Sequence, residues 1–128
     1  MAKSASTTSK PSSAAKLAQA IARIADGKKA RDIVILDLRQ LTSITDYFVI
    51  CTGEVDQHVK AIADEIEKRL APRDKPWHIE GYQHQSWILL DYVDVVVHIF
   101  QPETRQYYNL EKLWADAPRQ AFPEASKP

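Results

Sequence analysis

Residues 87–114 read WILLDYVDVVVHIFQPETRQYYNLEKLW, and this stretch decides the fold. Two apolar runs, 87–90 and 95–100, are separated by only four residues, which is the spacing of a β-hairpin. So short a link enforces antiparallel pairing of the two strands. The second strand stops at Pro102, because proline has no N–H to donate to a neighbouring strand. A short helix is then predicted over 104–114.

The chain before the hairpin contributes further strands and two helices. Continuous β-branched apolar runs at 32–38 and 47–52 are typical of strands covered on both faces. A short strand is expected at 77–80. Apolar residues recur at helical spacing over 13–27 and again over 55–70, which predicts two amphipathic helices.

The predicted order is α-β-β-α-β-β-β-α, which indicates an α/β fold in a single small domain. The sheet should be mixed and flanked by helices, because the hairpin is antiparallel whereas a strand-helix-strand passage can be a parallel crossover. We expect this domain to cover residues 14–116. Residues 1–13 lack hydrophobic periodicity and are expected to be a disordered tail, and residues 117–128, with three prolines, a ragged C-terminal tail.

Composition limits the class of protein. With 128 residues, 45% of them hydrophobic, the chain has enough apolar material for one core. It has neither a run of about 18 apolar residues that could cross a membrane nor a secretory signal, so no membrane association is expected. Cys51 is the only cysteine, which excludes an intrachain disulfide and fits a reducing compartment. We therefore expect a cytoplasmic protein.

The formal net charge of zero hides an asymmetry. Residues 1–31 carry seven Lys or Arg and one acid, whereas the remaining 97 residues carry ten basic and sixteen acidic side chains. A net acidic body is poorly suited to hold a phosphate backbone, so no direct nucleic-acid specificity is expected. It suits a basic partner better, although spread-out carboxylates can equally be a solvated surface.

No residue pattern indicates catalysis. Gly53 lies between a strand and a helix, as a phosphate-binding turn does, but neither GxGxxG nor GxxxxGK[ST] is present. Asp91 and Asp94 could hold Mg²⁺, but turn formation explains them more simply. The four histidines show no zinc-binding spacing. We expect no enzyme, no metal and no cofactor, with a nucleotidyltransferase-like enzyme using the two aspartates as an alternative.

Aromatic residues crowd the last third of the chain and favour a protein interface. Tyr107, Leu110 and either Leu113 or Trp114 form a helical stripe that should pack on the sheet, and we favour Leu113 as the third member. That stripe leaves three aromatic residues, Trp87, Tyr92 and Tyr108, as the better interface candidates. His98 lies inside a strand, where a histidine is usually half-buried and hydrogen-bonded rather than catalytic.

Five collinear blocks carry a resemblance to a known family. They are SITDYFVICTG (43–53), HVKAIADEIE (58–67), IEG (79–81), WILLDYVDVVVHIF (87–100) and ETRQYYNLEKLW (103–114). In these blocks the chain resembles the Iojap-related ribosomal silencing factor family, RsfS.

The resemblance implies a non-enzymatic translational repressor. Members of that family bind the large ribosomal subunit through ribosomal protein number fourteen, which is basic, and sterically block joining of the small subunit. The implied fold is a nucleotidyltransferase-like core without catalytic residues, often seen as a homodimer. Assembly of the large subunit through the same surface is an alternative function. Carried over by position, the implied partner-binding residues are Trp87, Asp91, Tyr92, Asp94, His98 and Tyr108.

Val93 departs from the family pattern, which usually has glycine at this place in the hairpin. A β-branched residue disfavours the positive φ of a tight turn. We therefore expect a wider turn here, with a possible shift of Tyr92.

Overall fold

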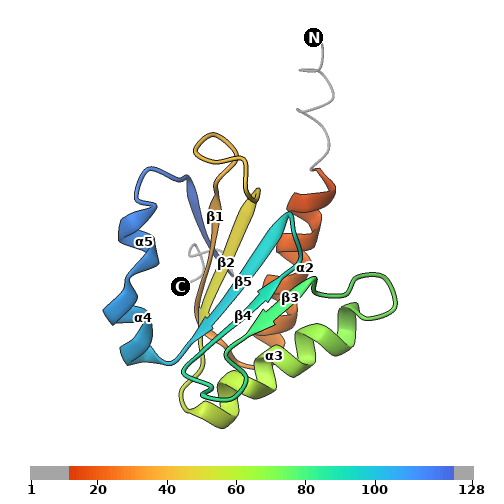
Figure 1. Ribbon diagram of the computed structural model, residues 1–128, viewed down its shortest axis with the longest axis vertical. Helices are drawn as coiled ribbons and strands as arrows, with labels where there is room; N and C mark the ends of the chain where they lie inside the picture. The colour runs from red at the N-terminus through yellow and green to blue at the C-terminus, as the bar shows by residue number, and fades with distance from the viewer. Residues whose placement is uncertain (1–11, 123–128) are drawn as a thin grey trace.

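The computed structural model describes residues 12–122 as one mixed sheet with helices on both faces (Figure 1). The helices are α2 (Ser13–Gly27), α3 (Asp56–Leu70), α4 (Pro102–Tyr108) and α5 (Leu110–Leu113). The strands are β1 (Arg31–Asp37), β2 (Tyr47–Thr52), β3 (His78–Glu80), β4 (Trp87–Asp91), β5 (Val95–Phe100) and β6 (Arg119–Phe122). The α/β class predicted from the sequence is confirmed.

The six strands lie in the order β3-β4-β5-β2-β1-β6. Only β2 and β5 are parallel, and the other neighbouring pairs are antiparallel, so the sheet is mixed as predicted. The hairpin of β4 and β5 pairs Trp87 with Phe100 and Asp91 with Val96. The parallel pairing then places Val96 beside Phe48.

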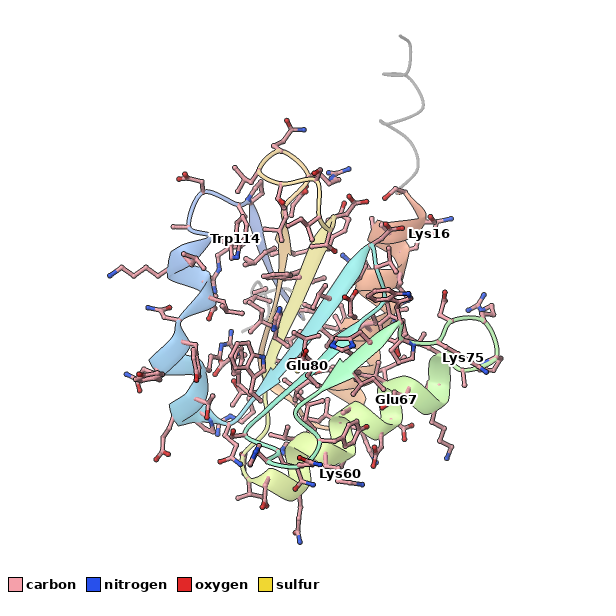
Figure 2. The ribbon with its side chains drawn as sticks, viewed as in Figure 1. Lys16, Lys60, Glu67, Lys75, Glu80 and Trp114 are labelled. Atoms are coloured by element: carbon pink, nitrogen blue, oxygen red, sulfur yellow. The ribbon has the colours of Figure 1, made fainter. Side chains whose placement is uncertain are left out.

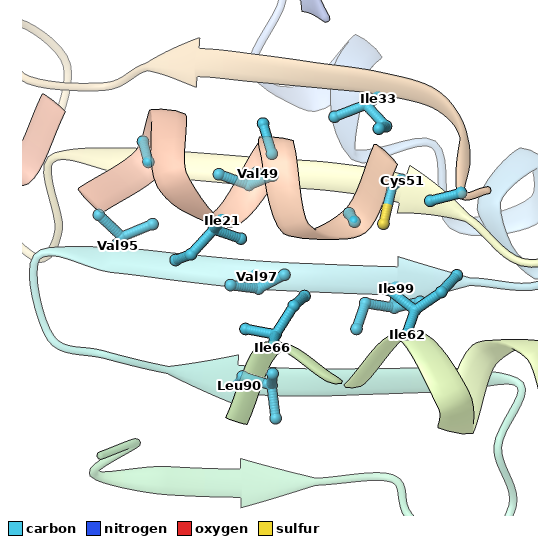
Figure 3. Close-up of a cluster of buried hydrophobic side chains, with 14 of the residues drawn as sticks. Ile21, Ile33, Val49, Cys51, Ile62, Ile66, Leu90, Val95, Val97 and Ile99 are labelled. Carbon is cyan, nitrogen blue, oxygen red and sulfur yellow. The ribbon is translucent and has the colours of Figure 1, made fainter. Parts of the chain in front are cut away.

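The larger core lies between the sheet and the helices α2 and α3, which cover the same face (Figure 1). Period-two alternation points Val95, Val97 and Ile99 of β5 into this core, where Figure 3 shows them against Ile21 and Ile66. All five side chains are fully buried. Burial of a side chain of this size is worth about 1.5–3 kcal/mol, so this layer is a main source of stability.

A smaller core lies on the other face, under α4 and α5. Its buried members are Val34, Leu36, Leu38, Ile50, Phe100 and Ala117. Strand β1 contributes to both cores, because its residues 33–36 are all buried. The continuous apolar run of this strand is thus explained by a helical layer on each face.

The helix predicted over 104–114 is interrupted. Asn109 adopts a left-handed conformation with φ 49°, which ends α4 and starts the short α5. The change in direction alters the buried stripe: Leu110 and Trp114 pack on the smaller core, as Figure 2 shows for Trp114. Tyr107 and Leu113 are 81% and 72% exposed, so their assignment to the core was wrong.

The C-terminal segment also differs from the prediction. Residues 119–122, which we expected to be ragged, form β6 and pair antiparallel with β1. The pairing of Ile33 with Phe122 gives β1 a second neighbour. Residues 1–11 and 123–128, which make up most of the two predicted tails, lie outside the described residues. Within residues 12–122, no helix has the length and apolarity needed to cross a membrane.

Candidate protein interface

Aromatic rings gather where α4 and α5 meet the second face of the sheet. We call this surface the aromatic face, and its members are Phe48, Trp87, His98, Tyr108 and Trp114. Strands β2, β4 and β5 supply the first three residues, α4 ends with Tyr108, and Trp114 directly follows α5. It contains three of the residues predicted from the sequence to bind a partner, Trp87, His98 and Tyr108.

Trp87 is the centre of the aromatic face. Its indole Nε1 donates a hydrogen bond to Nδ1 of His98 at 3.1 Å. Its ring centroid lies 4.7 Å from that of Tyr108 and 4.8 Å from that of Phe100. Trp87 is half-buried, so it supports the more exposed Tyr108 as well as contributing surface of its own.

His98 is buried, with 4% exposure, and this burial lowers its pKa to about 3. The imidazole is therefore neutral near pH 7. Because Nδ1 accepts the bond from Trp87, we assign the proton to Nε2. Nε2 has no hydrogen-bond partner among residues 12–122, and the ring meets Phe48 edge-on at a centroid distance of 4.4 Å. His98 thus positions Trp87 and offers little surface itself.

Exposed apolar side chains extend the aromatic face along α4 and α5. Tyr108 is 51% exposed, and its ring contacts that of Tyr107 at a centroid distance of 5.0 Å. Tyr107 on α4 and Leu113 on α5, which the sequence wrongly assigned to the core, also project into solvent. Sequence reasoning missed these two residues as candidate contacts because it assumed one continuous helix. A large apolar side chain left in solvent costs free energy, which makes these residues candidates for a contact with another molecule.

The hairpin between β4 and β5 adds negative charge. Asp94 is exposed and Asp91 is half-buried. An Oδ1 atom of Asp91 accepts a hydrogen bond from the backbone N–H of Val93 at 2.8 Å, which confirms the role of Asp91 in the turn.

The hairpin turn itself is tight. The N–H of Tyr92 donates to the carbonyl of Val95 at 2.8 Å, and the N–H of Asp94 donates to the carbonyl of Tyr92 at 2.9 Å. Val93 is the residue that this second hydrogen bond spans, and its φ of 75° is that of the central residue of a classic γ-turn. The expectation of a wider turn was wrong: valine accepts the strained conformation.

Tyr92 is not on the aromatic face. It is 7% exposed and packs in the larger core, on the side of the sheet covered by α2 and α3. Burial raises the pKa of its hydroxyl, so the side chain is a neutral core phenol. Its assignment as a partner-contacting anchor was therefore wrong.

The turn after β2 is closed to a phosphate. A Cβ on Gly53 would lie 2.9 Å from the backbone nitrogen of Val59, so glycine is needed for close packing against α3. The N–H of Glu54 is already used, because it donates to Nδ1 of His58 at 2.9 Å. Close packing against α3, rather than phosphate binding, explains the glycine at position 53.

Two other kinds of reactive site, a metal centre and a reactive thiol, were also considered for the described residues. No cluster of three or more His, Cys, Asp or Glu within residues 12–122 is arranged to hold a metal ion. Burial raises the pKa of the Cys51 thiol to about 12, so this sulfur is protonated and shielded from solvent.

The chain was compared with known families and proteins. The model of the family described as "Ribosomal silencing factor during starvation" matches residues 11–128. A protein from Halalkalibacterium halodurans named "Ribosomal silencing factor RsfS" is 43% identical over 103 residues, covering 80% of this chain and 88% of the relative. A mouse protein named "Mitochondrial assembly of ribosomal large subunit protein 1" is 37% identical over 91 residues, covering 68% of this chain and 40% of the relative.

A solved structure is also similar. The crystal structure of a Chromobacterium violaceum protein superposes with a TM-score of 0.76 and 31% sequence identity. The match covers 88% of this chain and 95% of that one. The likeness in fold therefore extends over most of both chains.

Proposed function

Because the chain belongs to the ribosomal silencing factor family, we propose that it represses translation by binding the large ribosomal subunit and blocking the small subunit. In this proposal the contact is with ribosomal protein number fourteen, a basic protein, and the block is steric. The bacterial relatives support placing the protein in the cytoplasm, where bacterial ribosomes work.

The observation that carries this proposal is the exposed apolar rim of the aromatic face, and the acidic turn of the β4–β5 hairpin is a second, separate feature of the same domain. Tyr107, Tyr108 and Leu113 offer apolar area that is not used inside the described chain. Tyrosine is enriched at interface centres because it buries a large area at a small cost in side-chain entropy. Asp94 adds a carboxylate that favours Lys or Arg on the partner and raises the rate of encounter.

Trp87 and His98 act behind this rim. The hydrogen bond between them and the contact of Trp87 with Tyr108 hold the tyrosine ring in one place before binding. A pre-ordered side chain loses less entropy on association, which increases affinity. Asp91 acts in the same way, because it shapes the turn that presents Asp94.

The test is sedimentation of purified large and small subunits with increasing amounts of the protein. We expect fewer joined ribosomes with the natural protein, and a loss of this effect in Tyr108→Ala. Truncation of an anchor at the centre of an interface costs about 2 kcal/mol or more, which is a loss of affinity of roughly thirtyfold. Val55→Ala is the control, because Val55 is 55% exposed and lies at the N-terminus of α3, which covers the other face of the sheet (Figure 1). Unchanged joining at saturating natural protein would refute the proposal.

A second function, assembly of the large subunit, is supported by the name of the mouse relative. The same aromatic face would then bind an immature subunit. Deletion of the gene separates the two functions, since an assembly factor leaves large-subunit precursors behind. A normal precursor profile together with altered subunit joining would favour repression.

A nucleotidyltransferase-like enzyme is the weakest alternative. It would need Asp91 and Asp94 to bind Mg²⁺, but one Asp91 oxygen is already used by the turn. Calorimetric titration with nucleotides and Mg²⁺ tests it directly, and binding heat would reopen this reading. The homodimer expected from the family is tested by sedimentation equilibrium, where Tyr108→Ala should shift the association if the two copies meet through the aromatic face.

A further inference from the structure

A groove of about 430 Å³ lies between the C-terminal halves of α2 and α3, on the face of the sheet opposite the aromatic face. We call it the basic groove. Its charged lining residues are Arg23, Lys28, Arg69, Arg73 and Glu65. Neither the aromatic face nor the packing of the core accounts for four cations at this place.

The basic groove follows from the helical repeat. Ala20, Arg23 and Gly27 lie three or four residues apart on α2, so they share one stripe at the edge of its buried face. On α3, Glu65 and Arg69 occupy the matching positions. The methyl group of Ala20 and the absence of a side chain at Gly27 leave space between the helices, and the arginines line that space.

The charge of the groove is only partly compensated. Glu65 is its one acidic lining residue and already lies 3.5 Å from Arg69. Arg23, Lys28 and Arg73 form no ion pair with any of residues 12–122. Cations are usual near helix C-termini, where the macrodipole supplies roughly half a negative charge per helix. Two helix ends cannot neutralise four cations, so the groove stays positive.

We propose that the basic groove binds the phosphate backbone of ribosomal RNA. This inference rests on the proposed function, because the RNA is that of the large subunit to which the aromatic face brings the protein. Arginine is suited to the task, since its planar fork of N–H donors pairs with two phosphate oxygens at once. The contact is independent of base sequence, which agrees with a groove that offers charge and few other polar groups.

The position of the groove makes a double contact possible. The helices α4 and α5 of the aromatic face lie on one side of the sheet and the helices α2 and α3, which form the basic groove, on the other (Figure 1). A protein and an RNA strand can therefore be bound together. The acidic hairpin is on neither helix of the groove and so does not line it. The body of the chain has more carboxylates than cations, but four cations gather in the groove. The groove can therefore bind a phosphate backbone although the net charge of the body does not favour it.

The first experiment measures the affinity of the full chain for purified large subunits as a function of KCl concentration. Each phosphate contact contributes about 0.7 to 0.9 to the slope of log affinity against log salt. The variant Arg23→Gln/Arg73→Gln should bind more weakly at low salt and should reduce the slope by roughly 1.4 to 1.8. The control Lys60→Gln/Lys75→Gln removes the same charge outside the groove and should leave the slope close to that of the natural protein (Figure 2).

The outcomes separate the two proposals. If the natural protein does not bind large subunits, both the proposed function and this inference are overturned. If it binds and the groove variant has the slope of the control, the inference is overturned and the proposed function stands. All four substituted side chains are exposed, so circular dichroism should show folded variants.

A second experiment distinguishes RNA from an acidic protein as the occupant. Cys51 is fully buried, so Asp26→Cys, an exposed position on α2, gives a single accessible thiol for a tethered iron chelate. Hydroxyl radicals from this position should cut the RNA of the large subunit at a confined site. Absence of cleavage above that of the unlabelled protein, with binding intact, would overturn the inference.

Discussion

His98 shows how a buried polar residue can organise a surface that it hardly reaches. Its ring accepts the indole N–H of Trp87, and Trp87 in turn supports Tyr108. The cost is a desolvated imidazole whose pKa is lowered to about 3 by burial. The geometry therefore depends on a neutral ring, and acid should weaken the fold.

The first prediction concerns this pH dependence. In the unfolded chain His98 titrates near its ordinary pKa of about 6.5, whereas in the folded protein it stays neutral down to a pKa of about 3. Between these values the unfolded state binds more protons, so the free energy of unfolding falls as pH falls, by up to about 1.4 kcal/mol per pH unit. Above pH 7 the contribution is complete. Urea unfolding at several pH values should show this slope in the natural protein.

The control for that experiment is His98→Gln, which keeps a hydrogen-bond acceptor for Trp87 and does not titrate. The difference in unfolding free energy between the two proteins should shrink as the pH is lowered from 7 to 4. A constant difference would mean that His98 is protonated in the folded state or that burial does not control its pKa.

Val93 is the clearest case of local strain. A φ of 75° is sterically unfavourable for a β-branched residue but not for glycine. We predict that Val93→Gly raises the free energy of unfolding by about 1 kcal/mol, since relief of strain exceeds the added entropy of the unfolded chain. Thermal unfolding measures the effect, with Asp94→Gly as a comparison because Asp94 does not have a positive φ. A destabilised Val93→Gly protein would show that the valine side chain contributes more than its strain costs.

The break at Asn109 is what leaves apolar side chains exposed at the end of the chain. One continuous helix would place Tyr107, Leu110 and Leu113 on one stripe, which is what the sequence predicts. The left-handed residue instead lets Leu110 and Trp114 pack while Tyr107 and Leu113 face solvent. Asparagine tolerates this conformation better than most residues, but spacing alone could not show that it would adopt it.

Arg105 fixes the broken helix to the sheet. Its guanidinium pairs with both oxygens of Glu111 at 3.0 and 2.9 Å. It also donates to the carbonyl of Asp32 and to Oγ1 of Thr52, each at 2.8 Å. Side-chain exposures of 12% for Arg105 and 18% for Glu111 make this a largely buried pair that joins α4, α5, β1 and β2.

We predict that Arg105→Met lowers the free energy of unfolding by about 3 kcal/mol, because the two sheet acceptors lose their donor and Glu111 keeps only the more exposed Arg119 as a partner. Glu111 has its pKa lowered chiefly by the hydrogen bond from Arg105, which shows how much the carboxylate depends on it. The double variant Arg105→Met/Glu111→Leu should recover part of the loss. Equal destabilisation in the single and double variants, measured by urea unfolding, would show that the pair is not coupled.

The strands were easier to predict than the helices at the C-terminus. Period-two alternation in the sequence of β5 puts Val96, His98 and Phe100 on one face, and the structure agrees: Val95, Val97 and Ile99 between them fill the larger core. The same rule, continued from Ile88 and Leu90, would have placed Tyr92 in the larger core. The alternation therefore indicates the buried position of Tyr92, whereas the usual preference of tyrosine for interfaces led to the opposite prediction.

Strand β6 had no comparable signal. Its four residues, RQAF, lie between two prolines and are largely exposed. A proline-bounded, polar segment is usual at the edge of a sheet, but it is equally usual in a loop. What places it beside β1 is the tertiary structure, since Phe122 packs against the larger core.

The molecule as a whole offers two surfaces of different chemistry on the two sides of one rigid sheet. One is apolar and aromatic, and the other is a basic groove. Their separation by a fully packed core means that a substitution on one surface should not disturb the other. The proposed binding through both surfaces can therefore be tested by asking whether the effects of substitutions on the two surfaces add.

The last prediction is that losses from the two surfaces add in free energy. If Tyr108→Ala and Arg23→Gln/Arg73→Gln each weaken binding to the large subunit, the triple variant should lose the product of the two affinity factors, within about 0.5 kcal/mol. Equilibrium binding to large subunits at one fixed salt concentration measures all four proteins. A triple variant no weaker than the weaker parent would mean that both surfaces meet the same partner group or bind in alternation. Since the sheet lies between them, only additive losses fit a protein held by a basic protein on one side and by RNA on the other.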